Sequence, residues 1–162
     1  MTAEQTFAAT ALNTWKITNA KADKFFSALT DEQLQAEVAP GKNRLVYLYG
    51  HLIAVHDRIL PLLGLGERLH PELDTPFLLE AENRSLPSPS AADLKRWWDE
   101  VNGAILAALE RLPAEDWLKP HTAVSAEDFA RNPLRNRLSV LLSRTTHVDY
   151  HLGQAALAKP GN

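Results

Sequence analysis

The sequence of 162 residues predicts an all-α fold, most simply a four-helix bundle. Three observations support this prediction. Four separate segments repeat apolar residues at steps of three and four, the spacing that places them on one face of a helix. No segment of useful length alternates apolar and polar residues, as a half-buried strand would. The connection between the second and third segments is about twice as long as the connection between the first two.

The first two segments are expected to form long helices. The first covers residues 3–29, and the second covers residues 45–63. Asn43 is a candidate N-cap for the second helix, because its side chain can accept a hydrogen bond from a free backbone N–H of the first turn. Gly64 is the candidate stop, since glycine readily adopts the left-handed conformation that ends many helices.

The last two segments have their own end signals. Ser90 resembles an N-cap before the third stripe, which runs over residues 94–112, and Pro113 is expected to end that helix. The fourth stripe runs over residues 134–155, and Pro160 is expected to close the last helix.

The connection formed by residues 64–89 decides the expected topology. A helix of about 20 residues is only about 30 Å long, so a connection of this length can run the whole height of a bundle. We therefore expect the second and third helices to run parallel, in the order up-down-down-up, with this segment as the crossover. Residues 1–162 are expected to form a single domain.

The composition excludes several classes of protein and site. The net charge is −3 and no lysine or arginine cluster offsets it, so nucleic acid is not an expected partner. No run approaches the roughly 20 apolar residues that a membrane span needs. The N-terminus resembles no secretory leader, so a cytoplasmic location is expected. The chain has no cysteine, so any metal site must use histidine, aspartate or glutamate.

Three histidines suggest such a site. His147 and His151 lie four residues apart in a helical segment, which puts both imidazoles on one face, one turn apart. His51 lies in another apolar helical segment. Two imidazoles from one helix and one from another would give a divalent metal three nitrogen ligands and leave a coordination position open. Open sites of this kind usually support chemistry.

A plainer interpretation stays open at this stage. Six histidines make a pair at this spacing common by chance, and a histidine on an apolar face is usually a core residue with a satisfied ring. The apolar setting shared by all three favours a common ligand, because a buried imidazole without a partner is unfavourable.

Residues around the three histidines are candidates for supporting roles. Arg144 and Gln154 continue the row of His147 along the last helix, and either could meet a substrate or orient a ligand. Tyr47 precedes His51 by one turn and could contact a substrate or simply pack. Asp149 is turned about 200° away from the ligand row and is expected to be a solvated charge.

Other polar and aromatic residues are expected to have ordinary places. His56 and Asp57 are predicted to belong to a solvent-facing side of the second helix, so His56 is not counted as a ligand. Trp97 and Trp98 are adjacent, about 100° apart on a helix, so both cannot face one core. One of them is expected to meet the long connection or a second subunit.

The motifs resemble one known family. Gly50-His51-Leu52 early in the second helix and His147-x3-His151-x-Gly153-Gln154 near the C-terminus look like the DinB-like family of metal-dependent proteins. The resemblance covers nearly the whole chain. It implies a four-helix bundle with up-down-down-up order, in which His51, His147 and His151 ligate one divalent metal, often zinc or nickel. It also implies a homodimer, and some relatives transfer low-molecular-weight thiols.

These observations lead to a primary hypothesis and two alternatives. The primary hypothesis is a metal-dependent enzyme that acts on a small-molecule substrate, such as a low-molecular-weight thiol S-transferase. One alternative is a metal-dependent hydrolase. The other is a non-catalytic interaction module that the metal stabilises. No catalytic side chain beyond the metal ligands is identified, because the sequence offers no clear general base.

Overall fold

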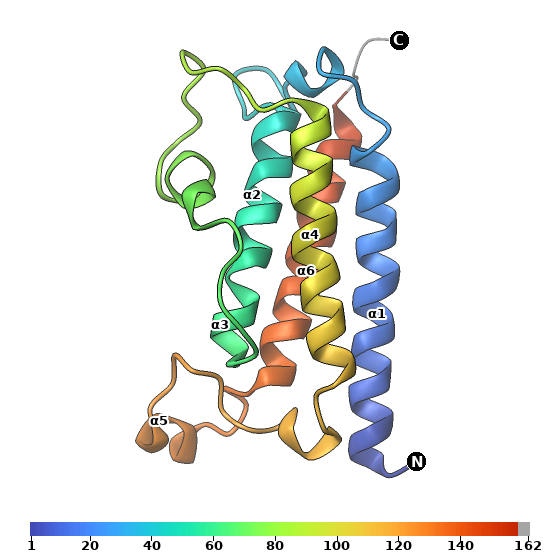
Figure 1. Cartoon of the computed structure of the whole chain (residues 1–162), viewed down its shortest axis with the longest axis vertical. Helices are drawn as coiled ribbons and strands as arrows, with labels where there is room; N and C mark the ends of the chain where they lie inside the picture. The colour runs from blue at the N-terminus through green and yellow to red at the C-terminus, as the bar shows by residue number, and fades with distance from the viewer. Residues whose placement is uncertain (159–162) are drawn as a thin grey trace.

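The computed structural model describes residues 1–158, and within them it contains helices and no β-strand. The prediction of an all-α fold is therefore confirmed. Long helices form the body of the molecule, and Figure 1 shows them packed side by side. They are α1 (Ala3–Phe26), α2 (Leu45–Asp57) with its continuation α3 (Ile59–Leu63), α4 (Ala91–Glu110) and α6 (Arg137–Leu157).

Figure 1 also shows the direction of each helix. α1 rises from the N-terminus at the lower end, and α2 with α3 descends on the far side of α4 and α6 from α1. The following segment climbs back along the outside of α2, so α4 descends as well, and α6 rises. The long connection between Gly64 and Ser90 is therefore a crossover that runs the height of the bundle.

Side chains cap most of the long helices at their N-termini. Thr2 and Gln5 form a reciprocal capping box at α1. Ser90 accepts from the Asp93 backbone N–H at 3.1 Å, as predicted. α6 begins later than predicted, because Asn136 is its cap. The predicted stop at Pro160 lies outside the described residues.

The second predicted helix is interrupted. α2 ends at Asp57 and α3 begins at Ile59, because Pro61 has no N–H to donate to the carbonyl of Asp57. The cap prediction for Asn43 was wrong, since Arg44 occupies the N-cap position and its side chain makes no capping bond. Gly64 ends α3 with φ 67°, as predicted.

The crossover packs on α2 and holds short turns of its own. These are the 3₁₀ turn η2 (Pro71–Leu73) and the π-helical turn η3 (Thr75–Leu79). The Asp57 carboxylate anchors the start of the crossover. It accepts from the backbone N–H groups of Leu69 at 2.7 Å and His70 at 3.0 Å, and from Arg68 Nε at 3.0 Å.

The prediction that His56 and Asp57 face solvent was wrong, because both residues are fully buried. The His56 ring lies 4.7 Å from the ring of Trp15 and 5.2 Å from that of Trp98. Its Nδ1 is 2.8 Å from Oδ1 of Asn102. The physical reason is that α1 and α4 cover His56, while the start of the crossover covers Asp57.

The third connection and the two adjacent tryptophans complete the packing. The connection contains the turn η4 (Ala114–Asp116) and the short helix α5 (Ala126–Arg131), which lie at the lower end in Figure 1. Trp98 is buried in the core, while the partly buried Trp97 lies 5.9 Å from the His70 ring on the crossover. One tryptophan therefore meets the long connection, as expected.

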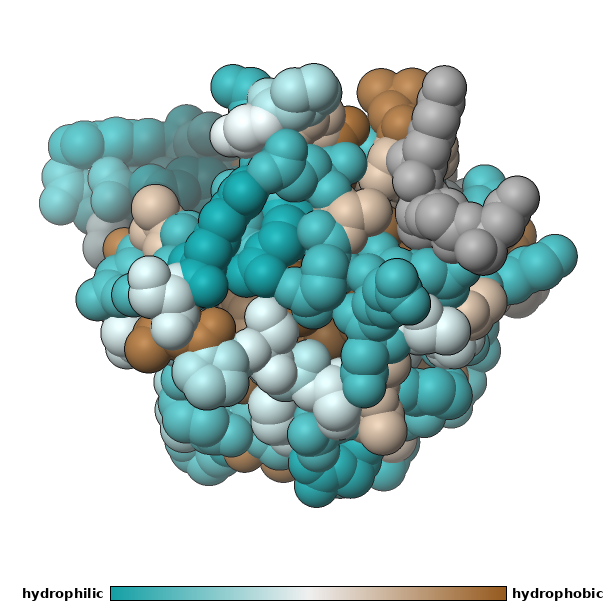
Figure 2. Space-filling model, turned by 90° about the horizontal axis from the view of Figure 1, so that it is seen from above, coloured by the Kyte–Doolittle hydropathy of each residue, from teal (hydrophilic) through white to brown (hydrophobic). Residues whose placement is uncertain are grey.

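The opposite end of the bundle has a mixed surface. Seen from above, it is largely hydrophilic, with hydrophobic residues scattered among the hydrophilic ones (Figure 2). Across residues 1–158, the helices include none with the length and apolar character needed to cross a membrane.

Candidate metal centre

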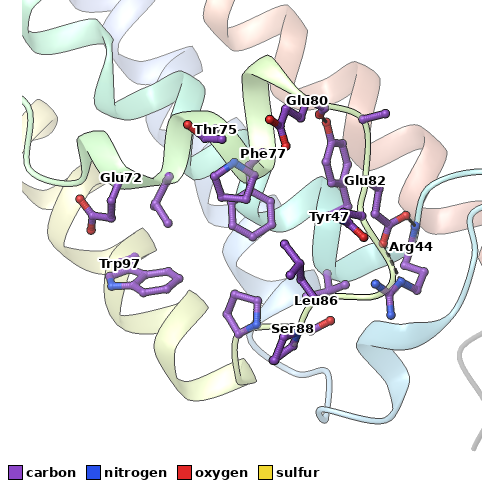
Figure 3. A pocket seen from close by; sticks show the side chains of 17 residues that line it. Arg44, Tyr47, Glu72, Thr75, Phe77, Glu80, Glu82, Leu86, Ser88 and Trp97 are labelled. Carbon is purple, nitrogen blue, oxygen red and sulfur yellow. Dashed lines mark hydrogen bonds and ion pairs between the residues drawn. The ribbon is translucent and has the colours of Figure 1, made fainter.

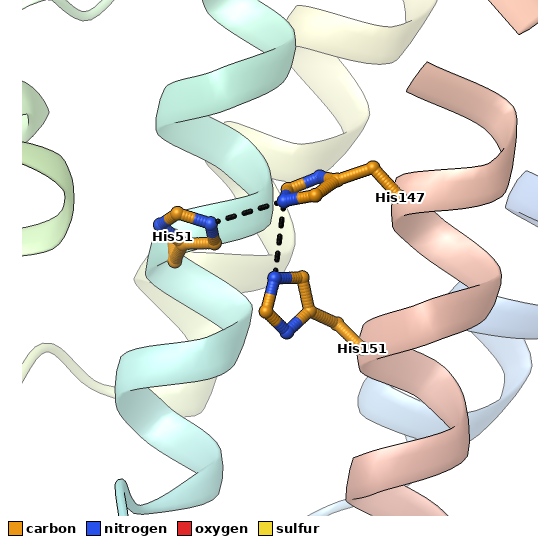
Figure 4. Close-up of side chains that lie close together, drawn as sticks. All are labelled: His51, His147 and His151. Carbon is orange, nitrogen blue, oxygen red and sulfur yellow. Dashed lines mark hydrogen bonds between the residues drawn. The ribbon is translucent and has the colours of Figure 1, made fainter. Parts of the chain in front are cut away.

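The three predicted histidines converge between α2 and α6. Nε2 of His147 lies 3.0 Å from Nε2 of His151 and 3.3 Å from Nε2 of His51. The three candidate ligand atoms all lie within 4.8 Å of one another. Figure 4 shows the rings turned toward a common point, with His51 reaching from α2 and the other two from α6. The helix spacing and the packing of α2 on α6 thus bring together residues separated by about 100 positions.

Local structure explains how α6 aims its two rings. Thr145 and Val148 are buried and hold one face of α6 against the bundle. His147 precedes Val148 by one residue, and His151 follows it by three, so both rings lie along the flank of the buried face. They are half-buried, between the core and the solvent.

The outer nitrogens of two of these rings face hydrogen-bond acceptors. His51 Nδ1 donates to the Phe77 carbonyl at 2.8 Å, and His151 Nδ1 donates to Oε1 of Gln154, also at 2.8 Å. A neutral imidazole carries one proton. Because Nδ1 holds it in both rings, each Nε2 presents a lone pair to the centre of the cluster. This is the arrangement that metal-binding histidines usually adopt.

The third ring has no such anchor. His147 Nδ1 is buried and has no hydrogen-bond partner within residues 1–158. Its Nε2 faces the lone pairs of both other rings, and a single proton there can point at only one of them. A cation placed among the three nitrogens would be favourable for all of them at once. The residues present therefore fit a divalent metal, which accepts neutral imidazole nitrogen readily.

The electrostatics keep these rings neutral. The pKa of His147 is lowered to about 4, mainly by burial, and the neighbouring His151 and His51 contribute in the same direction. Burial is also the main reason that the pKa values of His51 and His151 lie below the ordinary value for histidine. All three rings are therefore deprotonated at neutral pH, the form in which they bind metal.

The crossover positions His51. The Phe77 ring packs directly on Gly50, where an added Cβ would lie 2.4 Å from ring carbons. Only glycine at position 50 admits this contact, and the contact places the Phe77 carbonyl against His51. Tyr47 stacks beside His51, with ring centroids 6.3 Å apart, and donates from its hydroxyl to the Glu80 carbonyl at 2.9 Å.

Phe77 was missed by the sequence reasoning. It acts through a backbone carbonyl, which no side-chain pattern reveals. The only available signal was Gly50 inside an otherwise apolar helix, because such a glycine often marks a close approach of another segment.

A pocket opens beside the cluster. It has a volume of about 450 Å³, and His151 and Gln154 line one side of it. The opposite side is the loop before α2, including Lys42 and Asn43. Gln154 thus both accepts from His151 and borders this pocket, while its Nε2 donates to the Tyr150 hydroxyl at 3.2 Å.

A second pocket of about 430 Å³ lies under the crossover (Figure 3). Tyr47 and Phe77 form one wall, and Trp97 lies across from them. Arg44 and Glu82 form an ion pair at its edge, with Nε and Oε1 2.6 Å apart. None of the three histidines lines this pocket, so we do not assign it to the metal centre.

The remaining candidates fall on either side of the cluster. Arg144 is half-buried one turn before His147, and its charge lowers the pKa of His147 and His51. Asp149 is exposed and accepts from the Thr18 hydroxyl on α1 at 3.3 Å, so it points away from the cluster as predicted. Within residues 1–158, no carboxylate joins the three histidines.

Comparison with known proteins agrees with this geometry. A sequence profile of the DinB superfamily matches residues 14–155, which is most of the chain. The chain belongs to the DinB superfamily. The resemblance seen in the histidine motifs is thereby confirmed.

A solved DinB-like protein from Bacillus cereus ATCC 10987 has a similar structure. The two chains superpose with a TM-score of 0.67 at 24% sequence identity, over 94% of each. At this identity the similarity establishes the fold alone. A search of curated protein sequences found no match. The DinB membership and the histidine cluster are together compatible with metal binding.

Proposed function

We propose that this DinB-superfamily protein is a divalent-metal-dependent enzyme whose ligands are His51, His147 and His151, with zinc or nickel as the metal. The observation that carries the proposal is the orientation of the three rings. Two of them hold their protons on the outer nitrogen, and all three inner nitrogens lie within 4.8 Å of one another. Packing alone does not require three inner ring nitrogens to face each other.

The surroundings support an open site. Three protein ligands leave a zinc ion one position for a substrate, and no fourth histidine or carboxylate within residues 1–158 fills it. One of the three histidines, His151, lines a pocket of about 450 Å³ beside the cluster. A metal bound there would act as a Lewis acid that lowers the pKa of a bound thiol or water.

Transfer of a low-molecular-weight thiol to an electrophile is the reaction we propose. A thiol with pKa near 8.5 loses its proton far more readily than water does, so it depends less on a neighbouring general base. Among the described residues, no carboxylate lies with the cluster to serve as that base. In this scheme the histidines hold the metal, while Gln154 and the Phe77 carbonyl orient two of them.

Metal analysis tests the first part of the proposal. Protein purified without an affinity tag is equilibrated with zinc or nickel, dialysed and analysed. We expect about one equivalent in the wild type. Replacing His51, His147 or His151 by alanine should weaken binding at least a hundredfold, because two imidazoles make a poor site. His121→Ala is the matched control and should bind like the wild type. A wild-type protein that retains no metal would contradict the proposal.

A substrate panel tests the second part. The metal-loaded wild type is assayed with small thiols and activated electrophiles, and separately with esters and amides. We expect metal-dependent consumption of a thiol that stops on chelation and in His151→Ala. Metal-dependent hydrolysis without thiol consumption would replace our proposal by the hydrolase alternative. Unfolding of the helices on chelation would instead favour a structural metal.

Assembly also remains a proposal. The family resemblance implies a homodimer, and several large apolar side chains on the two neighbouring helices α1 and α6 are exposed. They are Phe7, Ile17, Leu142, Tyr150 and Leu157. Sedimentation velocity at micromolar concentration tests this proposal, and a monomer under those conditions would remove it.

A further inference from the structure

Arg144 has no acidic partner within residues 1–158. Most arginines in residues 1–158 form ion pairs, as Arg58 does with Asp74 and Arg135 with Asp128. Arg111 and Arg144 form none there. Arg111 is exposed to solvent, whereas Arg144 is half-buried. An unpaired charge is ordinary on the surface, but it is unfavourable where the protein removes part of its hydration.

The surroundings of Arg144 add to this imbalance. Burial is the main reason that the pKa of its guanidinium lies below the usual value, and the nearby Arg58 acts in the same direction. An anion beside Arg144 would oppose both effects. No side chain in the described part of the chain supplies one.

Arg144 lines a pocket of about 330 Å³. The other polar side chains that line it can donate hydrogen bonds to an anion. Arg135 and His121 line it, together with the hydroxyl residues Ser139 and Ser143. No aspartate or glutamate within residues 1–158 is part of its lining. The His121 ring accepts from the Ala123 backbone N–H at Nδ1, at 3.2 Å. Because the neutral ring then carries its proton on Nε2, His121 is a hydrogen-bond donor.

The location links this pocket to the metal centre. Arg144 precedes His147 by three residues, which is about 4.5 Å along the helix axis. The pocket beside His151 lies at the other end of the same histidine row. None of the three histidines lines the Arg144 pocket, so a small molecule held at Arg144 would have to span about one turn of α6 to reach His147.

We propose that the Arg144 pocket binds a carboxylate or phosphate group of the substrate, whose reactive end extends to the three histidines. The anion site stands on the Arg144 geometry alone. Its role in positioning a substrate rests on the proposed metal-dependent function. The substrate class is accordingly a small molecule that carries an anionic group at one end and the reacting atom at the other.

The first experiment tests the anion site without metal. Metal-free protein labelled with ¹⁵N is titrated with acetate and, separately, with inorganic phosphate, while the Arg144 Nε–Hε signal is followed. We expect saturable shifts in the wild type and loss of saturable binding in Arg144→Met. Arg111→Met removes the other arginine without an ion pair in residues 1–158 and should bind like the wild type. The preferred anion identifies the source as carboxylate or phosphate. Equal binding in Arg144→Met, or no saturable binding of either anion, would overturn the proposal.

The second experiment tests the link to the metal. Cobalt-loaded protein is titrated with mercaptohexanoate and with mercaptohexanol, which differ in the carboxylate alone, and sulfur-to-cobalt absorption is measured. A carboxylate bound to a guanidinium should make the first thiol bind roughly tenfold tighter or more. Arg144→Met should abolish this advantage, and Arg111→Met should keep it.

The two experiments separate the two proposals. An advantage that persists in Arg144→Met would overturn the positioning role while leaving the metal-dependent function intact. Failure of the protein to bind cobalt or thiol would instead count against the proposed function. The titration of metal-free protein would still decide whether Arg144 holds an anion.

Discussion

His51 and Asp57 lie six residues apart on α2, but their polar atoms are satisfied by different means. The Asp57 carboxylate is fully buried and accepts from two backbone N–H groups and from Arg68, all within the chain. The inner nitrogen of His51 faces two other imidazole nitrogens, and the described residues provide no group that satisfies all three.

The difference separates structure from function. A buried polar group whose partners all come from the protein holds segments together, as Asp57 holds the crossover on α2. A group of acceptors turned toward one another leaves a place for a ligand. The two sites therefore respond to opposite tests. Removal of Asp57 should damage the fold, while removal of a cluster histidine should damage metal binding and leave the fold.

The largest effect on stability is expected for Asp57→Ala. This change leaves two backbone N–H groups without their acceptor, while Arg68 keeps its ion pair with Asp74. Each buried N–H group left without an acceptor typically lowers the free energy of unfolding by about 1–3 kcal/mol. Urea unfolding followed by circular dichroism measures it. Asp99→Ala removes an exposed aspartate on α4 and should change little. Comparable stability of both variants would break the comparison.

Acid should lower the free energy of unfolding through His56, the buried neighbour of Asp57. Burial lowers the pKa of His56 to about 3 in the folded protein, against an ordinary value near 6.5. The unfolded chain therefore binds an extra proton between these values, and stability falls as the pH drops through this window. At pH 5 the linked loss is about 2 kcal/mol. Urea unfolding at pH 7 and pH 5 should show a smaller acid loss in His56→Gln than in the wild type. Equal losses would mean that His56 is protonated in the folded state.

Gly50→Ala should disturb both the packing of the crossover and metal binding. The new Cβ would meet the Phe77 ring at 2.4 Å and displace the carbonyl that orients His51. Overpacking of this kind typically lowers stability by about 1–3 kcal/mol, and loss of an orienting partner weakens metal binding roughly tenfold or more. Gly103→Ala is the matched control, because an added Cβ there meets nothing within 4 Å. Unchanged zinc affinity in Gly50→Ala would show that Phe77 does not position His51.

The smallest effect on stability is expected at the cluster itself. His151→Ala in metal-free protein removes one hydrogen bond to Gln154 but also relieves the facing lone pairs. The free energy of unfolding should therefore change by less than about 1 kcal/mol. Thermal and urea unfolding in the presence of chelator measure it. A loss as large as that of Asp57→Ala would show that the histidines are structural.

Much of the bundle was predictable because the sequence pattern of a helix involves only neighbouring residues. The apolar stripes located the long helices, and Ser90 and Gly64 marked two of their ends correctly. Errors arose where a distant segment changed the environment. His56 and Asp57 look solvent-facing in isolation, and only the packing of α1, α4 and the crossover buries them.

The sequence by itself determined the helical fold class and the choice of His147 and His151 as a pair, since both follow from spacing along one helix. It also made His51 a candidate, through the apolar helix around it. Only the tertiary structure decided that His51 meets the pair, that the Phe77 carbonyl orients it, and that Arg144 has no acidic partner among the described residues. These facts depend on contacts between residues far apart in the chain, and local periodicity carries no information about which distant groups meet.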